Sequence, residues 1–465
     1  MLFRHLYDDD LAQGSFLVGC QAAGEAIVID PRRDVGVYLD EAANANLRIV
    51  AVTETHVHAD YLSGSRELAV ATGAVLHLST PGDAYAFAAT PLRDGSVIDV
   101  GNVRVRAVHT PGHTPEHLAF LITDRATTDD PAIMVTGDFV FVGDVGRPDL
   151  IDETGRGADT RFAAAAALFR SLADRFLTLP DHLQVWPGHG AGSACGKALG
   201  AVANTTVGYE RRVAWWVPYV ERDDAPGFVD ELLAGQPDAP AYFGRMKRQN
   251  AAGPAILGAL PPLRPYGATE LADGAHLLVD ARPHALPPAA GIEGAISVPA
   301  GSRFATYASY VIDPERDVRP IVLLGTDSSV AEDLRARLLR VGIDRVVGYL
   351  HDVSAMPTRT LPSVAPGELD QLEDRFVLDV RTRSEFADGH VPGAHRLHAG
   401  SVMWNLDRIP RDRPVVTYCQ SGARSAVAAS ALRAAGFDDV RELHGSFDAW
   451  RRQQPAHIDV TTDDA

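Results

Sequence analysis

The chain has 465 residues, a formal net charge of −18 at pH 7 and 46% hydrophobic residues. This length predicts about two to four domains, and the composition is that of a globular protein. The negative charge disfavours sequence-independent binding to nucleic acid and docking on an anionic membrane. Only Lys197 and Lys247 are lysines, so arginine is the main fixed cation for binding an anion.

The N-terminal segment and the cysteines predict a cytoplasmic protein. The start, MLFRHLYDDDL, has no basic stretch followed by an apolar one, and no apolar run approaches the ~20 residues of a membrane span. The three cysteines, Cys20, Cys195 and Cys419, cannot form a disulfide framework. In a reducing cytoplasm, a cysteine within a recognisable loop becomes a candidate nucleophile.

In the first half of the chain, four predicted strands each run into a loop that carries His or Asp. These segments are LRIVAVTETH, VRVRAVHTPGH, AIMVTGDF and LQVWPGHG. Helices are predicted between them, at SRELAVATG and RFAAAAALFRSLADRF. The alternation predicts a layered α/β domain with a site on loops at one edge of a sheet.

Six residues on these loops are candidates for a metal site: His56, His58, Asp60, His113, Asp138 and His189. Imidazoles and carboxylates gathered at strand ends suit a divalent metal. One such histidine alone is more simply a hydrogen-bonded loop residue, but six in this order are not expected by chance. The motifs THVHAD, TPGHTP, TGDFVF and PGHG resemble the metallo-β-lactamase superfamily over roughly residues 1–240. That resemblance implies an αββα sandwich with one or two metals at this edge.

Tyr61 is a departure from the dinuclear hydrolases of that superfamily, such as glyoxalase II-type thioesterases. Those enzymes usually continue the motif as HxHxDH, and here Tyr61 replaces the last histidine. A phenol, with an ordinary pKa of about 10, is a poor ligand for a second metal at neutral pH. The substitution therefore favours a mononuclear site.

The persulfide dioxygenase branch of the superfamily is similar in motif and holds one non-haem iron through two His and one Asp. By this resemblance the metal ligands are His56, His113 and Asp138, which leave positions open for O₂ and substrate. The groups that orient ligands or handle protons would be His58, Asp60 and His189. We expect one Fe(II) per chain, with zinc as the alternative, because zinc has no second oxidation state for a redox reaction.

Two residues near these loops are candidates for handling the substrate. GDVGRPDL resembles the same branch, where the matching arginine lies near the thiol substrate, so Arg147 is expected to pair with a carboxylate of a glutathione-like molecule. A surface arginine that stabilises the loop is the alternative. Cys195, six residues beyond His189, is expected to reach the metal pocket and accept or relay sulfane sulfur, with a packed, inert thiol as the alternative. Cys20, in FLVGCQ, is interpreted as a core residue.

A Pro-, Gly- and Ala-rich segment at 244–267 is predicted to be a linker, and an internal repeat follows it. HLLVDARP, GIEGAISVP and IVLLGTDSSV match FVLDVRTR, GHVPGAHRL and VVTYCQSGAR in the same order. The matched residues are Asp280 with Asp379, Gly294 with Gly393, and Gly342 with Gly436. The predicted domains are therefore residues 1–243, 268–357 and 363–458.

The segment VVTYCQSGARSAVAASALRAAG predicts a buried strand, a loop of six residues and a helix that begins near Ser425. Cys419 lies at the base of the loop, where the helix N-terminus and Arg424 supply positive potential and favour the thiolate. The loop amides can turn inward to hold a persulfide sulfur and the oxyanion of thiosulfate or sulfite. The loop residues expected to bind substrate are Gln420, Ser421, Gly422 and Ala423.

The cysteine loop has four residues between Cys419 and Arg424, one fewer than in cysteine phosphatases, so it is tighter and suits sulfur better than phosphate. With VLDVRTRSEFADGHVPGA upstream, the last module resembles the rhodanese family. In the middle copy Gly325 and Val330 stand at the corresponding places. That copy therefore lacks thiol and guanidinium, and is expected to be an inactive spacer or an oligomer contact.

The order of domains resembles persulfide dioxygenase–rhodanese fusions across nearly the whole chain. The resemblance implies oxidation of a glutathione- or coenzyme A-like persulfide by O₂ to sulfite and thiol. It also implies transfer of sulfane sulfur through Cys419 to or from sulfite and thiosulfate, and a homo-oligomer. Two alternatives stay open: a zinc-dependent glyoxalase II-like thioesterase fused to a rhodanese, and a non-catalytic sulfur carrier or sensor.

Overall fold

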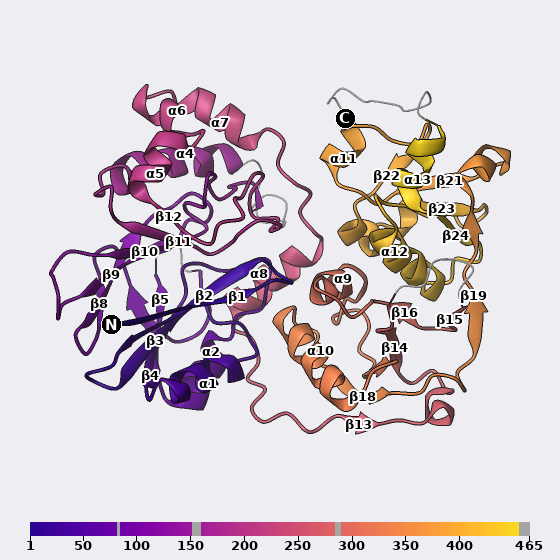
Figure 1. Ribbon diagram of the computed structural model, residues 1–465, viewed down its shortest axis with the longest axis horizontal. Helices are drawn as coiled ribbons and strands as arrows, with labels where there is room; N and C mark the ends of the chain where they lie inside the picture. Colours follow the sequence, from indigo (N-terminus) through magenta and orange to yellow (C-terminus); the bar gives the residue numbers. More distant parts are fainter. Residues whose placement is uncertain (81–83, 151–159, 284–289, 455–465) are drawn as a thin grey trace. The chain divides into compact units, whose positions relative to one another are not determined.

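The computed structural model describes residues 1–80, 84–150, 160–283 and 290–454. It divides into two compact units (Figure 1): unit 1 contains Met1–Ala239 and Phe243–Leu260, and unit 2 contains Pro240–Tyr242 and Pro261–Ala465. Across these ranges, every helix is too short or too polar to cross a membrane.

Unit 1 is built on two six-stranded sheets. The first has the order β1 (Leu2–Asp8), β2 (Gln13–Cys20), β3 (Glu25–Ile29), β4 (Arg48–Thr53), β5 (Val75–Ser79) and β6 (Thr90–Leu92). The second has the order β12 (Thr205–Thr206), β11 (Gln184–Pro187), β10 (Ile133–Gly137), β9 (Leu118–Asp124), β8 (Val103–His109) and β7 (Val97–Val100). The strands β3 to β6 are parallel to one another, as are β10 and β11.

The two sheets pack face to face because their strands carry apolar side chains on both faces. Successive residues of a strand point to opposite sides. Phe16 of β2 lies in the core between the sheets with Phe120 and Val135 of the second sheet. Its neighbour Leu17 lies instead in the core under α1 and α2. Every residue of β2 is consequently buried.

Helices cover the outer faces of both sheets. On the first sheet they are α1 (Gly36–Asn44) and α2 (Ser65–Thr72). Beside the second sheet are α4 (Arg161–Ser171) with a π-helical turn at Leu172–Phe176, α5 (Val207–Val213), α6 (Val217–Glu221) and α7 (Ala225–Leu233). Leu168 and Phe228 from these helices share a core with Leu121 and Met134 of the sheet. The expected αββα sandwich is confirmed, as are the four site-bearing strands and both predicted helices.

Unit 2 holds two modules with the same sheet topology. The middle module has the order β13 (Arg264–Pro265), β18 (Val346–Leu350), β17 (Ile321–Leu324), β14 (Leu277–Asp280) and β16 (Ile296–Ser297), and the last module has β20 (Ser363–Val364), β24 (Val440–Leu443), β23 (Val415–Tyr418), β21 (Phe376–Asp379) and β22 (His395–Arg396). All pairings in both sheets are parallel. A separate antiparallel pair joins β15 (Ala290–Ile292) to β19 (Thr358–Thr360).

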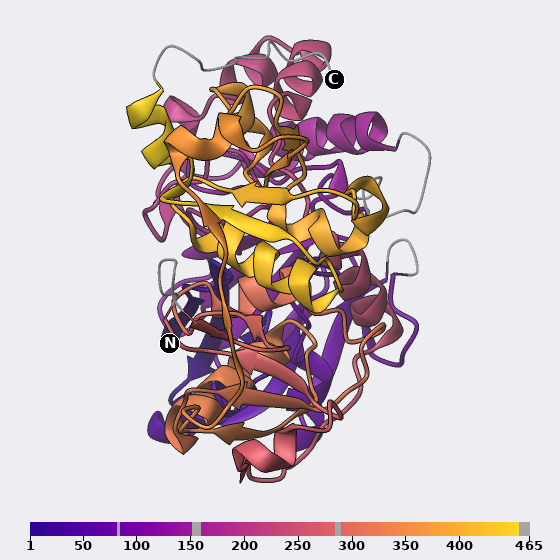
Figure 2. The same cartoon turned by 90° about the vertical axis from the view of Figure 1, so that its right-hand side faces the viewer.

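The helices of unit 2 follow the same repeat. The middle module contains α9 (Phe304–Val311) and α10 (Ser328–Arg340), with a 3₁₀ turn at Ala268–Leu271. The last module contains α11 (Arg383–Ala387), α12 (Ala423–Ala434) and α13 (Ser446–Gln453), with 3₁₀ turns at Pro366–Gln371, Ala399–Trp404 and Leu406–Arg408. In unit 2, α12 packs against β16 and α9 of the middle module (Figure 2).

The matched residues of the repeat occupy equivalent places. Asp280 ends β14 and holds Arg282 through two hydrogen bonds, and Asp379 ends β21 and holds Arg381 in the same way. The matched glycines all have positive φ: 74° at Gly294, 72° at Gly393, 69° at Gly342 and 82° at Gly436. Such backbone strongly favours glycine, which explains why the repeat keeps it.

The segment predicted to be a linker contains a helix. Residues Tyr242–Ala252 form α8, and the chain from 253 to 263 has no regular structure. The helix forms because Met246 and Asn250, four residues apart, share its buried face. Only the later part of 244–267 therefore has the irregular structure that its Pro and Gly content predicts. The end of the last predicted domain, 455–458, lies outside the described residues.

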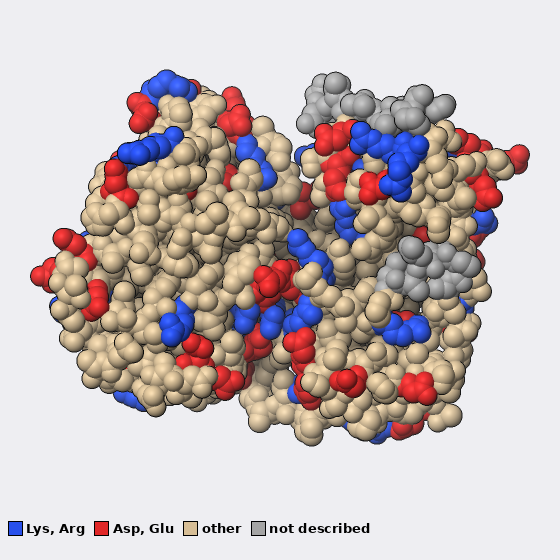
Figure 3. All heavy atoms as spheres, viewed as in Figure 1, with Lys and Arg blue, Asp and Glu red and all other residues tan. Residues whose placement is uncertain are grey.

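Charged side chains of both signs are interspersed on the visible face of each unit (Figure 3). No continuous basic stripe of the kind that follows a phosphate backbone is seen on the described part of this face.

Candidate functional site

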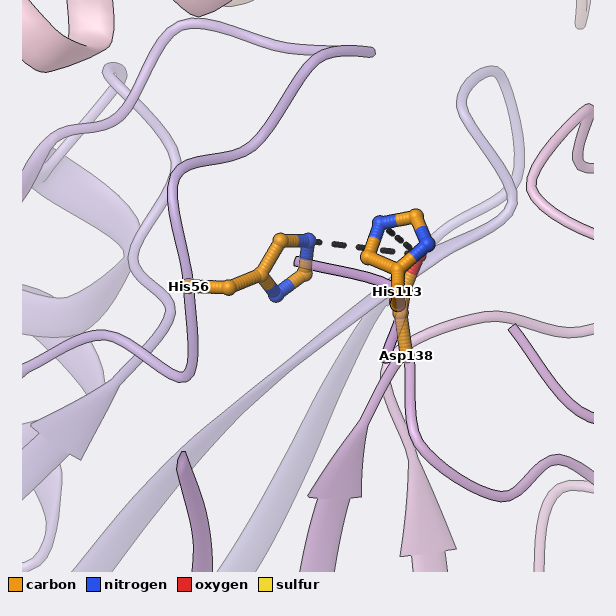
Figure 4. Close-up of side chains that lie close together, drawn as sticks. All are labelled: His56, His113 and Asp138. Atoms are coloured by element: carbon orange, nitrogen blue, oxygen red, sulfur yellow. Dashed lines mark ion pairs between the residues drawn. The ribbon is translucent and has the colours of Figure 1, made fainter. Parts of the chain in front are cut away.

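His56, His113 and Asp138 come together at one edge of the sandwich (Figure 4). Asp138 Oδ2 lies 4.0 Å from His56 Nε2 and 3.5 Å from His113 Nε2. The three side chains come from the loops after β4, β8 and β10, and all are buried. Two imidazoles and one carboxylate gathered in this way could hold a metal ion and leave other coordination positions open.

Hydrogen bonds orient both imidazoles so that Nε2 points at Asp138. His113 Nδ1 donates to the carbonyl oxygen of Arg147 over 2.8 Å. Thr55 Oγ1 donates to Asp30 and is left to accept from His56 Nδ1 at 2.9 Å. With the proton of each ring on Nδ1, the lone pair on Nε2 is available to a metal.

The protonation states suit a metal as well. Burial lowers the pKa of His56 well below its usual range, and neighbouring histidines lower it further, so the ring is neutral. Burial also lowers the pKa of His113. For Asp138, burial acts to raise the pKa, but His189 and His113 outweigh it and the net direction is down. Neutral imidazoles beside a carboxylate are the states that bind a metal ion.

The carboxylate of Asp138 shows most clearly that these residues fit a cation. Both of its carboxylate oxygens are buried and have no hydrogen-bond donor among the described residues. His189 Nε2, 3.5 Å from Asp138 Oδ1, offsets only part of the desolvation penalty of this buried carboxylate. A metal held by His56, His113 and Asp138 would remove this penalty, so the residues fit the group.

His117 supports the cluster and was missed in the sequence. Its Nε2 accepts a hydrogen bond from the backbone N–H of Asp138 at 3.1 Å, and its Nδ1 bonds to Thr110 Oγ1 at 2.8 Å. Its ring stacks on His56 with centroids 5.1 Å apart. Burial lowers the pKa of His117 to about 3, so the ring stays neutral and can accept this bond. The sequence TPGHTPEH offered a second histidine but no spacing signal for this role.

His58 points to a carboxylate outside the cluster. Its Nε2 lies 3.1 Å from Asp30 Oδ1, and its ring is 4.2 Å from that of His56. Burial acts to lower its pKa, but Asp30 outweighs burial and raises the pKa to about 9. Asp30 therefore holds His58 through Nε2, while His58 Nδ1 has no hydrogen-bond partner among the described residues. Its part in catalysis stays a prediction.

Asp60, His189 and Cys195 form a second buried group whose ligand atoms all lie within 4.8 Å of one another. His189 Nδ1 donates to the carbonyl oxygen of Ala12, so its Nε2 faces Asp60 Oδ2 at 3.3 Å and Asp138 Oδ1 at 3.5 Å. Burial acts to lower the pKa of His189, but Asp138 and Asp60 raise it to about 8. In this arrangement Nε2 carries a proton or faces a cation.

Cys195 reaches the metal pocket, as the sequence predicted, and is 2% exposed. Burial raises the pKa of its thiol well above the usual range, and the charges of Asp138 and Asp60 raise it further. The thiol is thus protonated unless a cation lies beside it. Whether it accepts or relays sulfur stays a prediction.

Tyr61 is buried and cannot replace the missing histidine as a ligand. Its hydroxyl donates to the carbonyl oxygen of Asp30 over 3.3 Å. Burial, together with Asp30 and Asp60, raises the pKa of the phenol well above its usual range. A phenol that stays neutral and donates elsewhere leaves the second group with one histidine and one carboxylate besides Cys195.

Arg147 lies in the interior with 0% of its surface exposed. Its Nε and Nη2 donate to the two carboxylate oxygens of Asp149, at 2.9 and 2.5 Å. Its Nη1 donates to the carbonyl oxygens of Ala194 and Pro237. These bonds fasten the loop after β10 to the loop that bears Cys195, which favours the structural alternative for Arg147. Its expected role in binding a substrate carboxylate stays a prediction.

Asn250 lies in α8, within the segment that was expected to be a linker, and forms hydrogen bonds to the loop that bears His58. Its Nδ2 donates to the carbonyl oxygens of His58 and Tyr61, and its Oδ1 accepts from the N–H of Ser63. The residue is buried. The sequence carries no signal that links positions 58 and 250, so only the fold reveals this brace.

Cys419 directly follows β23 and is 1% exposed. Two donors point at its sulfur: the N–H of Gly422 at 3.1 Å and Ser425 Oγ at 3.6 Å. The helix after the loop begins at Ala423, two residues earlier than predicted. Gly422 has φ of 120°, a conformation that only glycine adopts readily, and this turns its N–H toward the sulfur. Donors so placed stabilise negative charge on sulfur.

Arg424 follows the loop and is held by Glu385 of α11. Its two terminal nitrogens donate to the two carboxylate oxygens at 2.7 and 2.6 Å. Burial acts to lower the pKa of Arg424, but Glu385, Cys419 and Tyr307 outweigh it and raise it. The guanidinium is therefore fixed and charged near the thiol, as expected, with part of its field compensated by Glu385. Glu385 was not predicted, although it lies in the rhodanese-like segment SEFADGH.

The four predicted loop residues differ in what they offer a substrate. Ser421 and Ala423 line a cavity above Cys419. The side chain of Gln420 instead bonds to Arg381 at 3.2 Å and to Asp448 at 2.5 Å, and its carbonyl oxygen accepts from the N–H of Asp448, so its backbone N–H is the group left for a ligand. Gly422 donates to the sulfur itself. Substrate binding by these four residues stays a prediction.

Comparison with protein families agrees with this division of the chain. The metallo-β-lactamase superfamily model matches residues 9–189, and the rhodanese-like domain model matches residues 365–453. A sulfurtransferase of Allochromatium vinosum is 40% identical over 84 residues, which are 18% of this chain and 78% of that protein.

Two other relatives each match about two fifths of the chain. A hydroxyacylglutathione hydrolase of Polaromonas is 32% identical over 177 residues, 38% of this chain and 61% of that protein. The mitochondrial persulfide dioxygenase of Bos taurus is 26% identical over 195 residues, 41% of this chain and 68% of that protein.

One solved structure covers most of the chain. A metallo-β-lactamase from Staphylococcus aureus is 34% identical, with a TM-score of 0.66, and the alignment covers 75% of this chain and 99% of that one. Together with the αββα sandwich, its buried His and Asp cluster and the cysteine loop, these matches decide the family. The chain belongs to the metallo-β-lactamase superfamily and carries a rhodanese-like domain at its C-terminal end.

Proposed function

We propose that the chain oxidises a low-molecular-weight thiol persulfide with O₂ in unit 1 and transfers sulfane sulfur through Cys419 in unit 2. In the first reaction one persulfide, one O₂ and one water give one thiol, one sulfite and two protons. In the second, sulfane sulfur on Cys419 passes to sulfite and forms thiosulfate, or the reverse.

The arrangement of His56, His113 and Asp138 carries the first half of the proposal. Two neutral imidazoles and one carboxylate are the ligand set of non-haem iron sites that leave positions open for O₂ and substrate. One iron held there would supply the redox chemistry that zinc lacks. The similarity to the bovine persulfide dioxygenase supports the same reaction class.

Residues around the cluster would handle the proton and the substrate. His189 Nε2, 3.3 Å from Asp60 Oδ2, can hold a proton and release it as sulfite forms. Cys195 lies in the same pocket and can receive sulfane sulfur in exchange with the persulfide substrate. His58, fixed by Asp30, keeps a positive charge near the anionic substrate.

Cys419 carries the second half. Its thiolate attacks the outer sulfur of a donor, a new S–S bond forms on Cys419, and the donor leaves as thiolate or sulfite. The N–H of Gly422 and the hydroxyl of Ser425 hold the charge that moves between the sulfurs. The similarity to the sulfurtransferase of Allochromatium vinosum supports this chemistry.

A zinc-dependent thioesterase is the second candidate for unit 1. The group Asp60, His189 and Cys195 offers a second set of ligand atoms, and Asp138 faces both groups. The hydroxyacylglutathione hydrolase relative is consistent with hydrolysis. Tyr61 weighs against it, because it bonds to Asp30 and does not join the second group.

Oxygen-electrode measurements on anaerobically purified, iron-loaded protein separate these candidates. With glutathione persulfide we expect persulfide-dependent O₂ uptake and about one iron per chain in the same sample. Zinc near two per chain, no O₂ uptake and hydrolysis of an acyl-glutathione would instead establish the thioesterase. Bound metal without turnover of either substrate would identify a carrier or sensor.

A further inference from the structure

The cavity above Cys419 is built by both modules of unit 2. Its volume is about 370 Å³. The last module contributes Thr382, His398, Cys419, Ser421, Ala423 and Arg424. The middle module contributes Arg303, Thr306, Tyr307 and Tyr310, all from α9 or the residue before it. The module without a thiol therefore forms one wall of the site that has one.

This wall is packed firmly against the last module. The ring of Tyr310 meets that of His398 edge to face, with centroids 5.6 Å apart. A Cβ atom at Gly400 would lie only 3.0 Å from two ring carbons of Tyr310, so a larger residue there would push against the ring. Elsewhere on the interface, the N–H of Ser297 donates to Ser430 Oγ of α12 over 2.9 Å. Contacts of this kind hold α9 in place at the cavity.

The cavity has one arginine at its closed end and another at its open end. Cys419 lies at the closed end, 1% exposed, with Arg424 held by Glu385 beside it. Arg303 precedes α9 and is exposed, so the second guanidinium that lines the cavity lies at its open end. Tyr307, one turn after Arg303 in α9, also lines the cavity.

The volume of the cavity indicates which kind of sulfur donor can reach both its closed end and its open end. Pockets for small organic ligands measure roughly 300–1,000 Å³, and this cavity falls in that range. Thiosulfate carries its sulfonate one bond from the sulfur that Cys419 attacks, so it would occupy the closed end alone. A peptide-like persulfide has carboxylates several bonds from that sulfur, and these can reach the open end.

We propose that α9 of the middle module forms the binding site for the organic part of a carboxylate-bearing persulfide, with Arg303 binding its carboxylate while Cys419 takes its outer sulfur. The step rests on the sulfurtransferase activity proposed above. Cys419 thiolate attacks the outer sulfur of the persulfide, the S–S bond of the donor breaks, and the organic thiolate leaves. The sulfur gained by Cys419 is the sulfur lost by the donor, and no oxidant is needed.

Single-turnover loading of Cys419 in the full chain, without O₂, tests this role. The persulfide on the Cys419 peptide is quantified by mass spectrometry after quenching. The donors are glutathione persulfide, cysteamine persulfide, which has no carboxylate, and thiosulfate. In Arg303→Ala, loading from glutathione persulfide should slow about tenfold, as expected for a lost charged hydrogen bond. Loading from the other two donors should change less than about twofold.

Matched variants separate binding from folding and from net charge. Arg316→Ala removes another exposed arginine of the middle module, paired with Asp313, and should leave all three rates unchanged. Arg303→Lys should recover part of the loss, since a lysine keeps the charge without the planar fork. An equal rate for glutathione persulfide in wild type and Arg303→Ala would overturn the proposal, and so would equal slowing of all three donors. Failure of every donor to load the wild type would instead refute the sulfurtransferase itself.

Discussion

At the residue scale, the metal cluster depends on side chains whose work is to orient other side chains. Asp30 accepts from Thr55, Thr55 accepts from His56, and the ring of His56 is thereby turned toward Asp138. His117 does the same for Asp138 by accepting the hydrogen bond of its backbone N–H. Such supporting partners tune metal affinity without touching the metal.

Replacing His117 should therefore weaken the metal site. In His117→Ala the N–H of Asp138 loses its acceptor and His56 loses a stacked ring, so the ligands are less well ordered. We expect iron affinity to fall about 10- to 100-fold, measured by competition with a chelator of known affinity. His182→Ala, at an exposed histidine of unit 1, is the control and should bind iron like the wild type. Unchanged iron affinity in His117→Ala would show that His117 only fills space.

At the scale of elements, the cysteine loop is ordered by the helices on either side of it. α12 begins directly after Gly422, and α11 presents Glu385 to Arg424. Glu385 also caps its own helix, because it accepts from the backbone N–H of Thr382. Burial acts to raise the pKa of Glu385, but the bonds from Arg424 and Thr382 lower it to about 2.

The stability of this part of the fold should depend on that carboxylate. A lowered pKa contributes stability that is present above the ordinary value of 4.5 and is lost as pH falls toward 2. In Glu385→Gln, whose amide can still cap the helix, we expect local opening of α11 and α12 to become easier by about 1–2 kcal/mol at pH 7, after allowing for partial exposure. Hydrogen exchange of peptides from these helices measures it.

The difference between Glu385→Gln and wild type should shrink as pH falls from 4.5 toward 2, because the Glu385 carboxylate then gains a proton in the opened state, where its pKa returns to the ordinary value. Glu368→Gln changes an exposed carboxylate of the same module and serves as the control. A constant difference between pH 7 and pH 3 would mean that the ion pair with Arg424 is not its source.

At the scale of the whole molecule, one chain carries two sites, and the proposed product of the first is a proposed substrate of the second. Sulfite leaving unit 1 is an acceptor for sulfur on Cys419, and joining the two sites in one chain raises the effective concentration of each intermediate at the other. The middle module has the rhodanese-like sheet order but places Gly325 after β17, where the last module places Cys419. The middle module thus lines the cavity of Cys419 but contains no nucleophilic cysteine.

Removal of the sulfurtransferase thiol tests this coupling. In Cys419→Ser we expect the product to shift from thiosulfate to sulfite while O₂ uptake with glutathione persulfide is unchanged. Ion chromatography of the products beside oxygen-electrode traces measures both. Cys20→Ser, in β2 and outside both sites, is the matched control. An unchanged ratio of thiosulfate to sulfite would contradict the coupling.

The sequence by itself determined the class of fold, the repeat and the candidate residues of both sites. Strand periodicity with a His or Asp after each strand is a local signal, so six candidates that include His56, His113 and Asp138 could be found before any contact was known, and the family resemblance then singled out these three. The same is true of Cys419 and Gly422, which lie within one short loop. Local patterns suffice where neighbours in sequence are also neighbours in space.

Only the tertiary structure decided which groups surround those residues. Asn250 bonds to His58 across 192 positions of the chain, and Arg303 lines the cavity of Cys419 from another module. Arg147, expected at a substrate, was found buried against Asp149, because burial and partners depend on how distant segments pack. Packing sets each environment, and the environment sets the charge, the orientation and the reach of a side chain.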